Sequence, residues 1–131
     1  MFPKYLNPIL NKFPNYIWTK DQLILDIASN EVIIDFAKNK WSISEFNNYD
    51  HGRIFNLNFK ENWSALILVC ELLNKGYSKE DIHLEKSWKL GHNASGYCDL
   101  VLYKNNQAIY FFEIKNLDEI HKYTSLKNLL E

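Results

Sequence analysis

The feature that most constrains the fold is a pair of apolar segments, residues 97–103 and 108–115, separated by four polar residues. Both segments are rich in aromatic and β-branched residues, and the Asn-rich connection between them is typical of a β-hairpin turn. Residues 61–75 are apolar around most of a helical circumference, and Gly76 is a suitable residue to end that helix. Residues 82–88 alternate as a strand does. This order predicts an α/β domain with helices packed on a small sheet.

Charged residues interrupt both apolar segments. Asp99 lies within the first, and strand interiors disfavour aspartate. Glu113 and Lys115 lie near the end of the second, two residues apart, so their side chains share one face. Taken singly, Asp99 is explained by a bond to a loop amide, and Glu113 with Lys115 by an exposed ion pair. Taken together, they predict two carboxylates that bind a hard divalent cation, with a lysine beside them.

The hairpin register decides whether the two carboxylates can meet. A regular two-residue turn at Asn105 and Asn106 would pair Asp99 with Phe112, which puts Asp99 and Glu113 on opposite faces. The metal site therefore requires a longer loop or a β-bulge before Glu113, so that Asp99 faces Glu113 instead.

The spacing of Asp99, thirteen residues, Glu113, one residue and Lys115 resembles the PD-(D/E)xK nuclease motif, with Cys98 where that motif often has proline. A wider stretch, residues 61–115, is similar to the N-terminal nuclease domain of type I restriction enzyme R subunits. It is equally similar to the nuclease segment of restriction enzymes fused to N-6 adenine methylases. The residues that carry this likeness are those at 74–82, 84–88, 91, 96, 99–103 and 112–115.

The resemblance implies a restriction-endonuclease-like core, in which a small mixed sheet with a central β-hairpin is flanked by helices. It implies an Mg²⁺-dependent endodeoxyribonuclease in which Asp99 and Glu113 bind the metal and Lys115 orients the attacking water. Mn²⁺ is expected to substitute for Mg²⁺. The implied partners are DNA and further domains or subunits of a restriction–modification complex.

The family also uses a glutamate on its first core helix. Glu61 and Glu71 both fall on the less apolar face of the helix expected at residues 61–75. Glu61 matches the family position and is expected to be catalytic and to assist in metal binding; its ordinary role would be a favourable interaction with the helix N-terminus. Glu71 is expected to pair with Lys75, four residues later.

Residues 1–58 are expected to form a mostly helical extension, and residues 59–131 the nuclease-like core. Capping residues at 19–22 precede Leu23, Ile24 and Ile27 at helical spacing, and residues 31–41 fit either a strand or a helix, with helix preferred. Residues 42–58 read as a loop with a short strand at 54–57. Residues 117–130 read as a helix with an unburied apolar stripe, so we expect the core to be truncated at its C-terminus.

Composition excludes several classes of protein. Lys and Arg number 15 against 16 Asp and Glu, so the chain carries no overall basic signal for nucleic acid. The longest apolar run, residues 65–70, is far too short to cross a bilayer, and no membrane partner is expected. Cys70 and Cys98 form no Cys-x-x-Cys pair, which fits reduced thiols in the cytoplasm.

Two alternatives remain open: a non-catalytic interaction domain with the nuclease fold, and a nuclease of that fold directed at RNA or repair.

Overall fold

The computed structural model describes residues 3–89 and 95–115. Helix α1 (Pro3–Lys12) is followed by an antiparallel sheet of strands β1 (Tyr16–Trp18), β2 (Gln22–Ile27), β3 (Asn30–Asp35) and β4 (Lys40–Ile43), in that spatial order. After the short 3-10 helix η1 (Arg53–Phe55) comes helix α2 (Lys60–Asn74), and then the 3-10 helix η2 (Lys79–Asp81). The second sheet contains β5 (Ile82–Lys89), β6 (Ser95–Lys104) and β7 (Gln107–Phe112), with β6 in the middle.

The first sheet overturns the expectation of a mostly helical extension. Leu23, Leu25 and Ile27 of β2 point to one face, where they are fully or almost fully buried. Leu25 pairs with Val32 of β3, which also lies on the buried face. Ala28 and Ser29 form the turn between the strands, both with positive φ, as a tight hairpin turn requires. An alternation with period two therefore outweighs the helical spacing seen in the same residues.

The second sheet agrees with the expected order of helix, strand and hairpin, with three differences. Its described strands are all antiparallel, whereas a mixed sheet was expected. Where a strand was expected at 54–57, Ile54 and Phe55 belong to the 3-10 helix η1, and Asn56 forms an isolated β-bridge with Lys40. Strand β7 ends at Phe112, so Glu113 and Lys115 lie beyond the strand that was expected to contain them. The helix expected at 117–130 lies outside the described residues.

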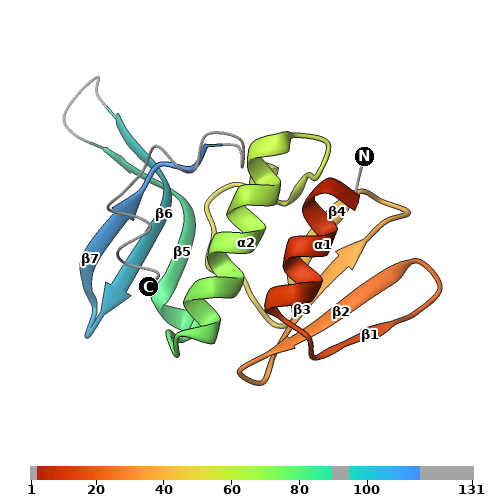
Figure 1. Cartoon of the computed structure of the whole chain (residues 1–131). Helices are drawn as coiled ribbons and strands as arrows, with labels where there is room; N and C mark the ends of the chain where they lie inside the picture. The colour runs from red at the N-terminus through yellow and green to blue at the C-terminus, as the bar shows by residue number, and fades with distance from the viewer. Residues whose placement is uncertain (1–2, 90–94, 116–131) are drawn as a thin grey trace.

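Helix α2 is the central element of the core. Figure 1 shows it between the β5–β7 sheet on one side and α1 with the first sheet on the other. Its positions from Asn62 to Leu73 are buried almost without interruption, which agrees with a helix apolar around most of its circumference. Gly76, with φ of 101°, follows its end and donates to the carbonyl of Leu73. None of the helices in the described residues is long and apolar enough to cross a membrane.

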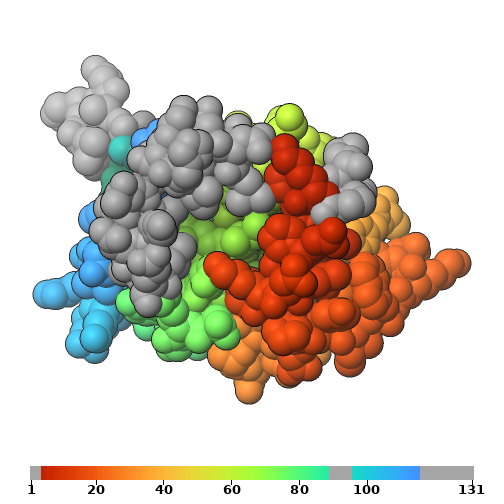
Figure 2. Space-filling model, viewed as in Figure 1, coloured from red at the N-terminus to blue at the C-terminus, as the bar shows by residue number. Residues whose placement is uncertain are grey.

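One hydrophobic core joins the two halves of the chain. Tyr5 of α1 stacks on Trp63 of α2, with ring centroids 5.4 Å apart. The same cluster of buried side chains extends from Leu25 in the first sheet to Leu100 and Phe112 in the second. In the space-filling view of Figure 2, the N-terminal residues in red and orange occupy one side of the molecule and β7, in blue, the other.

Candidate metal-binding site

The β6–β7 hairpin has the register that the metal site requires. Its two-residue turn at Asn105 and Asn106, both with positive φ, pairs Lys104 with Gln107. The register then shifts next to Leu102, and from there Leu100 pairs with Phe112. The next position of this register would set Asp99 opposite Glu113. The bulge before Glu113 that the metal site requires is therefore present, together with a two-residue turn at Asn105 and Asn106.

Glu113 and Lys115 nevertheless form an ion pair outside the cavity beside Asp99. The Lys115 Nζ lies 3.0 Å from the Glu113 Oε1, and the Glu113 side chain is 76% exposed. Neither residue lines the cavity beside Asp99. The described arrangement of these two side chains is therefore an exposed ion pair at a strand end.

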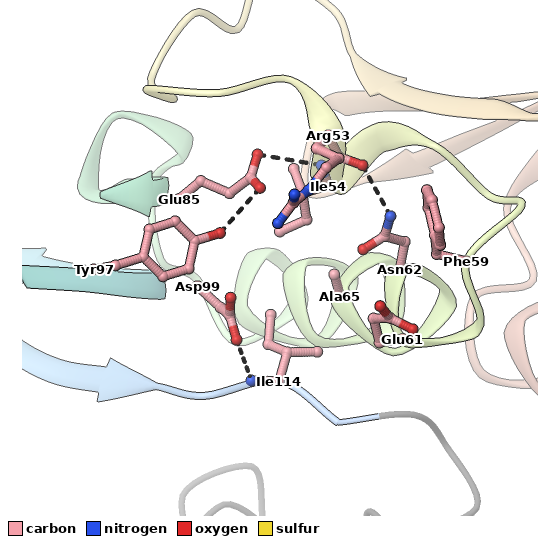
Figure 3. Close-up of a pocket in the computed structure, with 10 residues that line it drawn as sticks. All are labelled: Arg53, Ile54, Phe59, Glu61, Asn62, Ala65, Glu85, Tyr97, Asp99 and Ile114. Atoms are coloured by element: carbon pink, nitrogen blue, oxygen red, sulfur yellow. Dashed lines mark hydrogen bonds between the residues drawn. The ribbon is translucent and has the colours of Figure 1, made fainter. Parts of the chain in front are cut away.

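Asp99 and Glu61 line one cavity of about 330 Å³, which we call the carboxylate pocket (Figure 3). Asp99 comes from the middle of β6 and Glu61 from the first turn of α2. Ala65 lies one helical turn after Glu61, and its small side chain leaves space above the helix. The full lining is Arg53, Ile54, Phe59, Glu61, Asn62, Ala65, Glu85, Tyr97, Asp99 and Ile114.

Asp99 also holds the segment that follows β7. The backbone N–H of Ile114 donates to its Oδ2 at 2.7 Å, and Asp99 is half-buried. This contact ties residues 113–115 to the pocket, although the Glu113 side chain is turned outward. It also leaves the second carboxylate oxygen of Asp99 available to a ligand.

Glu85 is a third carboxylate of the pocket and the most enclosed, with 3% of the residue exposed. Its Oε1 accepts from the backbone N–H of Ile54 at 3.2 Å, and its Oε2 accepts from the hydroxyl of Tyr97 at 3.1 Å. Desolvation of the phenol, followed by the negative charge of Glu85, raises the pKa of Tyr97 to about 12. Glu85 has a φ of 53°, an uncommon conformation for a residue with a side chain. Strain of this kind is concentrated at functional sites.

The chain between the two sheets is fixed to the second sheet at several points. Asn48 donates to the carbonyls of Glu80 and Ile82, at 2.9 and 3.2 Å. Asp50 accepts from the backbone N–H of Ser87 at 2.8 Å and lies 2.7 Å from Nε2 of His83. These bonds set the position of Arg53, which follows on the same segment and lines the carboxylate pocket.

The pocket offers oxygen ligands of the type that binds a divalent cation, but there are too few of them to complete a metal site. Asp99 and Glu61 offer the carboxylate oxygens that Mg²⁺ and Mn²⁺ prefer. Both oxygens of Glu85 already accept hydrogen bonds, so it is better suited to support the site than to bind the metal. Within residues 3–89 and 95–115, no group of three His, Cys, Asp or Glu side chains is close enough to hold a metal ion.

Sequence reasoning identified Asp99 and Glu61, but it missed the other polar residues of the pocket. Glu85 follows the buried Leu84, so strand alternation predicts a surface residue; in the structure it is buried and has a φ of 53°, which departs from strand geometry. Tyr97 reads as a strand residue. Arg53 could have been singled out from the sequence, since it is the only arginine in the chain.

Glu71 is a further correction, because its partner is not Lys75. It is buried between the helices and forms an ion pair with Lys12 at the end of α1. The spacing along α2 could not reveal this contact, because it depends on how α1 packs against α2.

Comparison of the chain with protein-family models, with curated proteins and with solved structures gave no match. The functional assignment therefore depends on the residues and their geometry, together with the sequence resemblance.

Proposed function

We propose that this chain is the nuclease core of an Mg²⁺-dependent DNA endonuclease that hydrolyses phosphodiester bonds within a restriction–modification protein. The observation that supports it most is the hairpin register, which brings the backbone of Glu113 next to Asp99 at the edge of the carboxylate pocket. A two-residue turn without the bulge would have put Asp99 and Glu113 on opposite faces of the sheet. DNA as substrate, and other domains or subunits as partners, come from the sequence resemblance.

Asp99, Glu61 and Glu113 are the proposed metal ligands, and Lys115 the residue that positions the attacking water. When bound, the metal would supply an activated water and stabilise negative charge on the phosphate. Glu113 must turn from Lys115 toward Asp99 for this. Exposed ion pairs are worth about 0–1 kcal/mol, so the rotation costs little compared with metal binding.

Cleavage of supercoiled plasmid DNA in Mg²⁺ or Mn²⁺ tests the proposal. Wild type should nick the plasmid, and EDTA should abolish nicking. Asp99→Asn keeps an oxygen that can accept from Ile114 but removes the charge, so it should fold and be at least about 100-fold slower. Asp26→Asn is the matched control, since Asp26 is an exposed aspartate on the other sheet. Equal rates for the two variants, or nicking that persists in EDTA, would refute the assignment.

The second candidate is a non-catalytic interaction domain that keeps the nuclease fold. The Glu113–Lys115 ion pair favours it, because neither residue lines the pocket. A well-folded wild type that neither binds Mn²⁺ nor nicks DNA would support this candidate.

A further inference from the structure

Arg53 has an unusual position for the only arginine of a chain with 15 Lys and Arg residues. It lines the carboxylate pocket and also an adjoining cavity of about 400 Å³, which is bordered by His51, Gly52, Glu85 and Tyr97. Figure 3 shows the guanidinium directed into the pocket, on the side of Tyr97 and Asp99. The other residues in that count are lysines. The guanidinium of Arg53, a planar cation with five N–H donors, therefore lies where the two cavities meet.

The backbone of this residue is fixed firmly. The Arg53 carbonyl accepts from the side-chain amide of Asn62 at 2.9 Å, and the next N–H, that of Ile54, donates to Glu85. Three elements, η1, α2 and β5, therefore hold the base of the side chain. The backbone at Arg53 therefore needs no further ordering when the guanidinium binds a ligand.

The acidic residues of the pocket do not bind the guanidinium. Among the described residues, no ion pair within 4.0 Å joins Arg53 to a carboxylate. Glu85 is engaged by Ile54 and Tyr97, and Asp99 by Ile114. The donors of Arg53 are thus directed into open space, where a ligand with several acceptor oxygens can reach them.

We propose that Arg53 binds a phosphate group of the nucleic-acid substrate, next to the carboxylates that hold the metal; this inference rests on the proposed nuclease function. The guanidinium fork matches two phosphate oxygens, which a lysine cannot do in the same geometry. Three carboxylates line the pocket beside this one guanidinium, so they repel a phosphate until a divalent cation is bound. Arg53 and the cation therefore act together, and Arg53 is a positioning residue for the substrate.

The test measures fluorescence anisotropy of a labelled DNA duplex in Ca²⁺, a hard cation that also prefers oxygen ligands, at several KCl concentrations. The proteins are wild type, Arg53→Gln, Arg53→Lys and Lys20→Gln. Lys20 is an exposed lysine in the turn between β1 and β2, and its variant removes the same charge far from the pocket. The melting temperature of each variant confirms folding, and each is also assayed for plasmid nicking in Mg²⁺ and Mn²⁺.

Arg53→Gln should weaken binding by at least about tenfold and lower the slope of log affinity against log salt by about 1. Arg53→Lys should recover the salt slope but not the full affinity, and Lys20→Gln should match wild type. Arg53→Gln should also bind Ca²⁺ more tightly, because a repelling positive charge is gone.

The outcomes separate this inference from the proposed function. If wild type binds and nicks DNA but Arg53→Gln has the same affinity and salt slope, the role of Arg53 is refuted and the nuclease proposal stands. If binding depends on Arg53 while no cation supports nicking, Arg53 binds phosphate but the chain is no nuclease. Wild type that binds no DNA in Ca²⁺ would refute the role of Arg53, and wild type that also fails to nick DNA would overturn both proposals.

Discussion

Glu85 and Asp99 lie in the same pocket but in different surroundings. Glu85 is almost wholly enclosed and both its oxygens accept hydrogen bonds, whereas Asp99 is half-buried and bonded through one oxygen to Ile114. A carboxylate that is fully satisfied inside the protein supports structure, and one with a free oxygen at a cavity can bind a ligand. Residue type and position along the chain could suggest Asp99, but the burial of Glu85 depends on contacts with Ile54 and Tyr97 that the sequence does not reveal.

Removal of the Tyr97 hydroxyl tests the supporting role of Glu85. Tyr97→Phe should lower the free energy of unfolding by about 1 kcal/mol, since a buried carboxylate oxygen loses its hydrogen-bond donor. Urea denaturation at pH 7 measures the change. Tyr97→Phe should leave the plasmid-nicking rate unchanged. The control is Phe46→Leu, a substitution in a different cavity, which should also leave this rate unchanged. A large loss of nicking in Tyr97→Phe with unchanged stability would instead make Tyr97 part of the chemistry.

At the scale of elements, the second half of the fold was predictable and the first half was not. Helix α2, its end at Gly76 and the three strands that follow have apolar patterns longer than a few residues and clear turn residues. The first sheet has neither. Its β2–β3 turn is formed by Ala28 and Ser29, without glycine or proline, and Leu23, Ile24 and Ile27 fit a helix as well as a strand. Only packing against α1 and the partner strands decides between the two.

The bond between Asp50 and β5 should make stability depend on pH. The N–H of Ser87, and then His83, hold the pKa of Asp50 below its ordinary value of 3.8. A lowered pKa stabilises the fold at pH values above the unfolded-state pKa, and this contribution is lost as the pH falls through the folded-state pKa. Asp50→Ala should therefore be less stable than wild type at pH 7, and the difference should shrink below about pH 4. Urea denaturation at both pH values checks this, and a difference that stays constant or grows in acid would contradict it.

The Lys12–Glu71 ion pair adds to the apolar contact between α1 and α2. Only 9% of the Glu71 side chain is exposed, compared with 62% for Lys12. Lys12→Met leaves this buried carboxylate unpaired and should cost about 1–3 kcal/mol, between the values for exposed and buried pairs. The double variant Lys12→Met/Glu71→Leu should recover much of that loss in thermal unfolding. If Lys12→Met is as stable as wild type, the ion pair does not hold the helices together.

For the whole molecule, the continuous core predicts that both sheets unfold together. Buried residues from α1, both sheets and α2 form one cluster, and Tyr5 stacks on Trp63 across the two halves of the chain. Thermal unfolding should therefore give one transition, with coincident midpoints by far-UV circular dichroism and tryptophan fluorescence. Two separate transitions would mean that residues 1–58 and 59–131 are independent units.

The central claim is that Asp99 and Glu113 bind one divalent cation at the edge of the carboxylate pocket. Mn²⁺ titration followed by electron paramagnetic resonance tests it most directly, because the signal of free aqueous Mn²⁺ falls as the ion binds. Wild type should bind Mn²⁺, Asp99→Asn and Glu113→Gln should each weaken binding by at least about tenfold, and Asp26→Asn should have no effect. Glu113→Gln is the decisive variant, since Glu113 is exposed beside Lys115 and must turn to reach the metal. Wild-type affinity in Glu113→Gln, or no binding by wild type, would contradict the claim.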